Sequence, residues 1–211
     1  MFRGALRNIS IVCFMLCPML CAAAQEQAKH IGPRPAFDGR WWLSISDSER
    51  SGVLSGYLDC YSNEYKGSGR FLTKAYDRYR DLVTKLYHDD ASLGVEKLPS
   101  AIYRLRDKPG EKPEYPAGEP VAGAHEGNDG LYWRQANQRG HAEQLGFVEG
   151  YLLCHEKLAD SRGGVFSKSP EEYRGRISRW YRYDEAADAI DPVREHEAIA
   201  TVLFKVRSIE Q

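Results

Sequence analysis

Apolar residues recur along this chain at the spacing of a helix. Between residues 46 and 61 they lie three or four positions apart, which places them on one helical face; they are Val53, Leu54, Tyr57, Leu58 and Tyr61. Residues 46–49, Ser-Asp-Ser-Glu, come just before this run and have the pattern of a capping box. The pattern predicts a helix that begins near Ser46.

Two more amphipathic runs follow the first. The second run carries Tyr76, Tyr79, Val83, Leu86 and Tyr87, and the third carries Leu98, Ile102 and Leu105. No stretch alternates convincingly with a period of two, which is the pattern of a half-exposed strand. We therefore predict an all-α protein.

The same order of runs occurs twice. Residues 49–90 lie without a gap on residues 143–184, and many positions are identical, among them Gly52/Gly146, Gly56/Gly150, Tyr57/Tyr151, Cys60/Cys154, Tyr79/Tyr173, Arg80/Arg174 and Tyr87/Tyr181. Upstream, Trp41-Trp42 corresponds to Tyr132-Trp133. Because an internal repeat constrains the architecture, we predict a tandem duplication of a three-helix unit, packed with pseudo-two-fold symmetry.

The boundaries of the units follow from composition. Residues 107–130 are rich in Pro and Gly and contain little to bury, which is typical of a linker. We expect helical repeat 1 at 37–106 and helical repeat 2 at 131–211. In repeat 2 the second helix is expected to start at the sequence Ser169-Pro170, and the third to contain Ile199, Val202, Leu203 and Val206.

A stripe of small residues runs along the first helix of each unit. Gly52, Gly56 and Cys60 are four positions apart, and Gly146, Gly150 and Cys154 repeat the pattern. Glycine inside a helix costs about 1 kcal/mol relative to alanine, so its recurrence needs a reason. We interpret the stripe as the surface on which the two first helices pack closely; the alternative is the floor of a ligand groove.

Two cysteines, Cys60 and Cys154, occupy equivalent positions in the repeat. Cys60 and Cys154 can meet only near an axis that relates the two units, and we predict a disulfide between them. Such a bond requires the helices to cross near the cysteines. The alternatives are two buried thiols or bonds to another chain.

Two Glu–Arg sets recur in the units. Glu49 and Glu143 lie one turn before the first glycines, and Arg80 and Arg174 lie on the second helices. We expect a charge-assisted contact of Glu49 with Arg80 and of Glu143 with Arg174. The functional alternative is a pair of glutamates for acid–base catalysis.

Aromatic residues suggest a second kind of site. Tyr and Trp are favoured at interfaces, and they also build the cores of small helical domains. We expect Trp41, Trp42, Tyr132 and Trp133 to belong to a core, with an aromatic binding surface as the alternative.

The start of the chain is typical of a signal peptide. Arg3 and Arg7 precede an apolar run from Ile9 to Leu20, and three alanines end at Ala24. We expect residues 1–24 to be removed, residues 25–36 to form an N-terminal tail, and the protein to be periplasmic or secreted. No later segment is apolar for long enough to span a membrane.

Charge and composition narrow the function classes. Without its leader the chain has 27 basic and 30 acidic residues, a net charge of −3, which disfavours a nucleic-acid partner. Its histidines lack metal-ligand spacing, and no catalytic or cofactor motif is present, so we expect neither metal nor cofactor. The sequence favours a non-enzymatic binding protein of the cell envelope, whose partner is another protein or an envelope component. Alternatives are a hydrolase that uses the paired glutamates and a self-associating structural protein; the oligomeric state is left open.

Overall fold

The computed structural model describes residues 36–64, 72–108, 128–158 and 165–208. Over these ranges the chain is mostly helical and contains no strand, so the all-α prediction is confirmed. All elements belong to the unit formed by residues 37–211. The expected signal peptide at 1–24, nearly all of the expected tail and most of the expected linker lie outside the described residues.

The elements fall into two sets, before and after the linker. The first set consists of α2 (Gly39–Ser44), α3 (Asp47–Glu64), α4 (Tyr76–Asp89), the short 3₁₀ helix η2 (Ala91–Val95) and α5 (Leu98–Arg104). The second consists of α6 (Gly130–Gln138), α7 (His141–Leu158), α8 (Pro170–Trp180) and α9 (Ile199–Val206).

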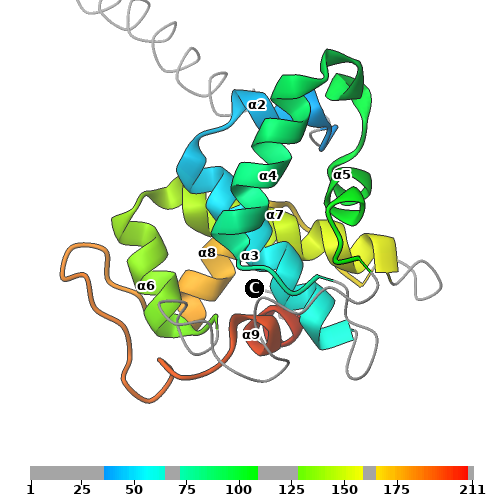
Figure 1. Cartoon of the computed structure of the whole chain (residues 1–211). Coiled ribbons are helices and arrows are strands. Elements are labelled where there is room, and N and C mark those ends of the chain that lie inside the picture. Colours follow the sequence, from blue (N-terminus) through cyan, green and yellow to red (C-terminus); the bar gives the residue numbers. More distant parts are fainter. Residues whose placement is uncertain (1–35, 65–71, 109–127, 159–164, 209–211) are drawn as a thin grey trace, which may run out of the picture. The chain divides into compact units, whose positions relative to one another are not determined.

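Helices α3 and α7 form the centre of the unit, and they pack against each other more extensively than any other two elements (Figure 1). Residues 51–57 of α3 are all buried, as are residues 146–151 of α7. These central segments are therefore packed against other parts of the protein on every side, as is typical of a core helix. The amphipathic helices α4 and α8 cover α3 and α7, respectively.

The glycines allow the backbones of α3 and α7 to touch. A Cβ atom on Gly52 would overlap the carbonyl oxygen of Glu143, and one on Gly56 would overlap that of Phe147. The relation is reciprocal, because a Cβ on Gly146 would overlap the carbonyl oxygen of Glu49, and one on Gly150 that of Val53. We call this contact, made by Gly52, Gly56, Gly146 and Gly150, the glycine seam.

The seam ends in a disulfide bond between Cys60 and Cys154, whose Cα atoms are 6.1 Å apart. Gly52 and Gly56 face successive turns of α7, so the two helices run in the same direction. Residues further along one helix therefore meet residues further along the other. This register accommodates the glycines and the cysteines in one contact, and the predicted disulfide is present.

Several interactions occur once in each set of elements. The indole N–H of Trp42 donates to Thr84 Oγ1 at 3.0 Å, and that of Trp133 donates to Ser178 Oγ at 3.0 Å. The amide of Leu98 donates to Phe37 O, and that of Ile199 donates to Asn128 O, each at 2.7 Å. The hydroxyl of Tyr87 donates to Glu96 O at 3.1 Å, and that of Tyr181 donates to Glu197 O at 2.5 Å. We refer to these three couples as the paired contacts.

Within the described residues, each set holds one α-helix more than the three that the sequence predicted, and the first set also holds the 3₁₀ helix η2. The aromatic pairs, expected to precede the first helix, form the short helices α2 and α6 themselves. The cause is an aspartate cap: Asp38 accepts from the amide of Trp41, and Asp129 accepts from the amides of Leu131 and Tyr132. Helices of six and nine residues are too short to display a periodic pattern.

Candidate binding pocket

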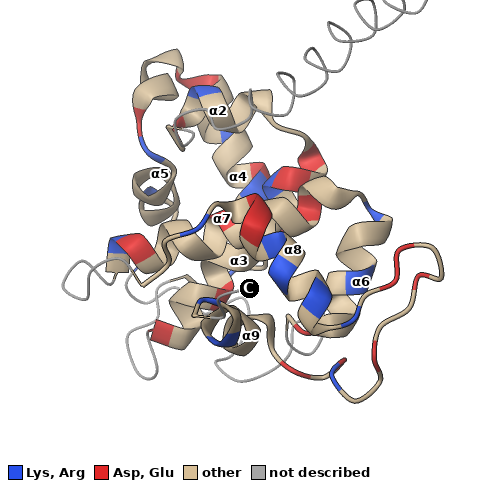
Figure 2. Ribbon diagram, turned by 180° about the vertical axis from the view of Figure 1, so that it is seen from behind, with Lys and Arg blue, Asp and Glu red and all other residues tan. Residues whose placement is uncertain are grey.

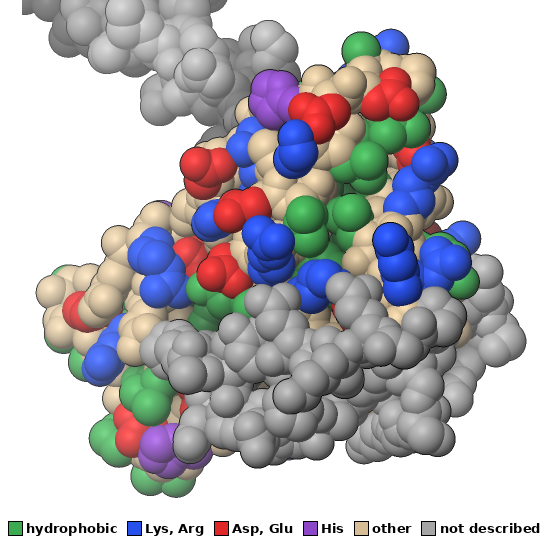
Figure 3. All heavy atoms as spheres, viewed as in Figure 1, with side chains coloured by type: hydrophobic (Ala, Val, Ile, Leu, Met, Phe, Trp, Pro, Cys, Tyr) green, Lys and Arg blue, Asp and Glu red, His purple; other side chains and the backbone are tan. Residues whose placement is uncertain are grey.

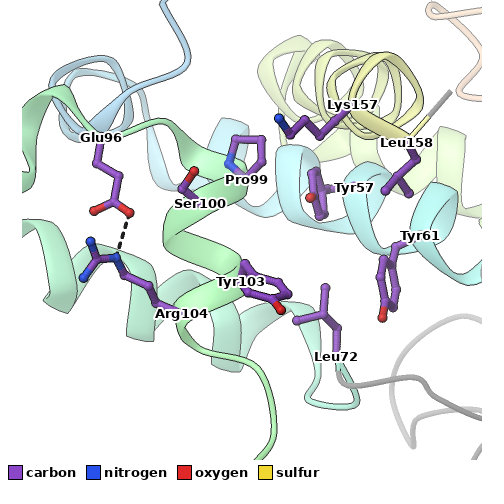
Figure 4. Close-up of a pocket in the computed structure, with 10 residues that line it drawn as sticks. All are labelled: Tyr57, Tyr61, Leu72, Glu96, Pro99, Ser100, Tyr103, Arg104, Lys157 and Leu158. Atoms are coloured by element: carbon purple, nitrogen blue, oxygen red, sulfur yellow. Dashed lines mark hydrogen bonds and ion pairs between the residues drawn. The ribbon is translucent and has the colours of Figure 1, made fainter. Parts of the chain in front are cut away.

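A pocket of about 420 Å³ opens between α5 and the C-terminal ends of α3 and α7 (Figure 4). Helix α3 contributes Tyr57 and Tyr61, and α7 contributes Lys157 and Leu158. The remaining described lining residues come from α5 and from the segments before α4 and α5; they are Leu72, Glu96, Pro99, Ser100, Tyr103 and Arg104. The pocket therefore rests on the fixed α3–α7 pair and is closed on one side by a short helix.

Three tyrosines, Tyr57, Tyr61 and Tyr103, contribute to the walls of the pocket. Tyr57 and Tyr61 are largely buried, and each therefore exposes only a small part of its side chain to the pocket. Tyr103 is 52% exposed, and the guanidinium of Arg106 lies 4.2 Å from its ring centroid. Tyrosines combine an apolar ring with a hydroxyl tip, which suits a wall that meets both apolar and polar parts of a ligand.

The charged groups of the pocket differ in how they are paired. Arg104 Nε donates to Glu96 Oε1 at 2.7 Å, while the other carboxylate oxygen of Glu96 is buried and has no hydrogen-bond partner among the described residues. Lys157 is exposed and forms no ion pair with any residue of the described ranges. The carboxylate is thus balanced by Arg104, and Lys157 leaves a positive charge at the rim.

The structure does not bring together the glutamates and arginines that the sequence paired, in either repeat. Glu143 is bound instead by Arg139, at 2.6 and 2.7 Å, and accepts from Tyr132 OH at 3.2 Å. Arg174 contacts His141 and Gln144, and Arg80 contacts Ser51 and Asp81. Arg139 reaches Glu143 because it lies only four residues before it, at the end of helix α6, which was not predicted from the sequence.

Glu49 has a different neighbour from the one expected. Burial, together with the negative charges of Glu49 and Glu171, raises the pKa of Glu149 to about 8. Glu149 is only 6% exposed, and its Oε2 has no hydrogen-bond partner among the described residues. Burial also raises the pKa of Glu49. Sequence reasoning missed Glu149 because Ser55 holds the matching position in repeat 1.

The aromatic pairs lie in the interior. Trp42 and Trp133 are fully buried, Tyr132 is 3% exposed, and Trp41 is half-buried with its ring centroid 4.8 Å from that of Phe37. These residues therefore build the core rather than a binding surface. The residues that do line a pocket, such as Tyr57 and Tyr61, looked in the sequence like ordinary core positions.

Charge on the surface is mixed. Acidic and basic residues are interspersed along the helices (Figure 2), and on the face with α4 and α5 their side chains intermingle (Figure 3). Within the described ranges, no three His, Cys, Asp or Glu side chains are arranged to hold a metal ion. No described helix has the length and apolar character needed to cross a membrane.

Comparison with known proteins adds no assignment: no family model, no curated protein and no solved structure matches this chain.

Proposed function

We propose that the protein is an exported, non-enzymatic binding protein of the cell envelope, and that the pocket between α5 and the α3–α7 pair is its binding site. The observation that carries the proposal is the cavity of about 420 Å³, whose lining combines three tyrosines with apolar and charged side chains. Ligand sites are concave and mostly apolar, with a few polar groups that orient the ligand. The partner is an envelope component or another protein that presents a small group to the pocket.

The scaffold supports binding because its walls are held in place before a ligand arrives. Helices α3 and α7 are joined by the glycine seam and by the Cys60–Cys154 disulfide. A preformed site loses little conformational entropy when it binds.

Export is the second part of the proposal. It rests on the expected signal peptide at residues 1–24. The disulfide is compatible with it, because such bonds persist mainly in oxidising compartments.

We also propose that residues 37–106 and 131–211 are copies of one helical unit related by a pseudo-two-fold axis. The reciprocal glycine seam and the paired contacts support this proposal. The hydrogen bonds of Leu98 and Ile199 match α5 with α9 residue by residue. Ser100 then corresponds to Thr201.

A test of the binding function compares two tryptophan substitutions at these corresponding positions. Ser100→Trp puts a bulky ring in the pocket, whereas Thr201→Trp puts the same ring on the exposed surface of α9. The oxidised mature protein and both variants are incubated with a low-molecular-weight envelope extract and analysed by native mass spectrometry.

The proposal expects a bound mass on the unmodified protein and on Thr201→Trp, and its loss from Ser100→Trp. Equal melting temperatures of the two variants show that folding is not the cause. Identical bound species on all three proteins, or none on any, contradict the proposal.

A further inference from the structure

The place in the second set of elements that matches the pocket is filled by the chain itself. In the internal repeat, Leu72 lies on Phe166, and the pocket residues Tyr57 and Tyr61 lie on Tyr151 and His155. The match of α5 with α9 places Tyr103 on Phe204. These counterparts form one cluster around the ring of Phe166.

The ring of Phe166 is held by edge-to-face contacts. Its centroid is 5.0 Å from that of His155, with an interplanar angle of 83°, and 6.4 Å from that of Tyr151, at 89°. Tyr173 lies edge-on at 5.5 Å and 88°, and Phe204 lies at 5.3 Å with a tilted angle of 57°. Aromatic pairs prefer such separations and angles. A benzene-sized ring is therefore a group that this arrangement of side chains accommodates.

In the first set the position of Phe166 holds the smaller Leu72, and a cavity lies there. Three aromatic side chains, Tyr57, Tyr61 and Tyr103, line the cavity, and their counterparts surround Phe166. The geometry points to a ligand ring that enters the pocket as Phe166 does in the second set.

The rim adds a charge preference. The Lys157 side chain extends from the end of α7 toward Pro99 (Figure 4), and its match in the repeat is the uncharged Asn63. Glu96 is already bound by Arg104. The group beside the ring is therefore favoured when it is anionic, because Lys157 can form a charge-assisted hydrogen bond with it.

We propose that the pocket binds an aromatic ring that carries a carboxylate, with the ring between the tyrosines and the carboxylate at Lys157. This inference rests on the proposed binding function. Two sources share this chemistry: a free aromatic acid, and the last residue of a peptide that ends in Phe, Tyr or Trp.

The test is isothermal titration of the oxidised mature protein with matched probes. 3-Phenylpropionate carries ring and charge, 3-phenylpropanamide lacks the charge, and hexanoate lacks the ring. Ala-Ala-Phe, with a free or an amidated C-terminus, represents the peptide source. Two variants accompany the protein: Leu72→Phe, which installs the residue of the second set, and Lys157→Gln, which removes the rim charge.

We expect 3-phenylpropionate or Ala-Ala-Phe to bind one molecule per chain, about tenfold more tightly than the probe that lacks charge or ring. The better of the two identifies the source. Leu72→Phe abolishes binding, and Lys157→Gln reduces it to the level of the amide probe. Thr201→Trp leaves it unchanged.

Equal affinity for the charged and uncharged probes, or for the aromatic and aliphatic acids, overturns this proposal. So does an absence of binding by every probe. In each case the Ser100→Trp comparison with extract reports separately on the binding function, which stands if a bound mass is still lost there.

Discussion

At the scale of single residues, the carboxyl groups on α3 and α7 differ in their burial and in their hydrogen-bond partners. Glu143 is bound by Arg139 and Tyr132, whereas Glu49 lies near another acid, Glu149. The two glutamates are identical in the sequence repeat but have opposite surroundings. Their substitution should therefore have opposite effects.

Glu143→Gln removes the Arg139 contact and leaves a buried amide beside Tyr132. We expect a loss of about 1–3 kcal/mol in unfolding free energy at pH 7, since buried charge-assisted contacts lie in this range. Glu49→Gln should be neutral or stabilising, because burial already disfavours the charged form. Urea unfolding measures both; losses of equal size would contradict the description of these surroundings.

Glu149 predicts a pH dependence. Its pKa is about 8 in the folded protein, above the ordinary value of 4.5. Below pH 4.5 the carboxyl is protonated in both states and costs nothing. As the pH rises from 4.5 to 8, only the unfolded state releases the proton readily, so stability falls, and above pH 8 the full penalty remains.

The variant Glu149→Gln should therefore raise the melting temperature at pH 9, less at pH 7 and little at pH 4. Glu156→Gln changes an exposed glutamate on the same helix and serves as the control. Thermal unfolding at the three pH values measures the trend. A gain that is constant across pH would show that packing, not ionisation, is responsible.

At the scale of elements, the glycine seam sets the distance between α3 and α7. Its glycines lower the intrinsic stability of the helices, because glycine loses more backbone entropy on folding, but they let carbonyl oxygens lie where Cβ atoms would otherwise be. The stability of the unit therefore depends more on this contact than on helix propensity.

Gly150→Ala tests this dependence. Alanine favours the helix by about 1 kcal/mol, but its Cβ would overlap the carbonyl oxygen of Val53, and a net loss of roughly 2–4 kcal/mol is expected. Gly175→Ala on α8 is the matched control, because the nearest atom to its Cβ, Arg179 Nη1, is 3.7 Å away. Chemical denaturation should show the control to be neutral or stabilised. Stabilisation of both variants would contradict the seam.

Much of the helical framework was predictable from the sequence, and the pocket was not. The periodic run of residues 76–87 predicted α4, the internal repeat predicted α8, and Ser169 caps α8 as expected. Short helices such as α2 and the contact of Glu143 with Arg139 depend on caps and turns that carry no period. The pocket depends on which position of a repeated core holds a smaller side chain, and Leu72 alone does not reveal that a cavity accompanies it.

At the scale of the whole molecule, one covalent bond links segments that are far apart in the chain. The Cys60–Cys154 disulfide spans a sequence separation of 94 residues. Closing so long a loop restricts the unfolded state strongly, and the chain-entropy model gives roughly 4–5 kcal/mol.

Reduction should therefore lower the melting temperature by many degrees while leaving the helical circular-dichroism signal intact at 20 °C, because the glycine seam persists. The double variant Cys60→Ser, Cys154→Ser should melt at the same lower temperature with or without reductant. If the unmodified protein melted at the same temperature with and without reductant, the bond would be absent in solution.

Joining α3 and α7 within one polypeptide also has a consequence for what evolution can change. In a dimer of identical subunits every substitution appears at both symmetric places, so neither place can specialise alone. Here Leu72 and Phe166 are encoded separately, and so are Lys157 and Asn63. Under the proposed duplication, Phe166 can fill its position and stabilise the core while the position of Leu72 keeps the cavity that we propose as the binding site.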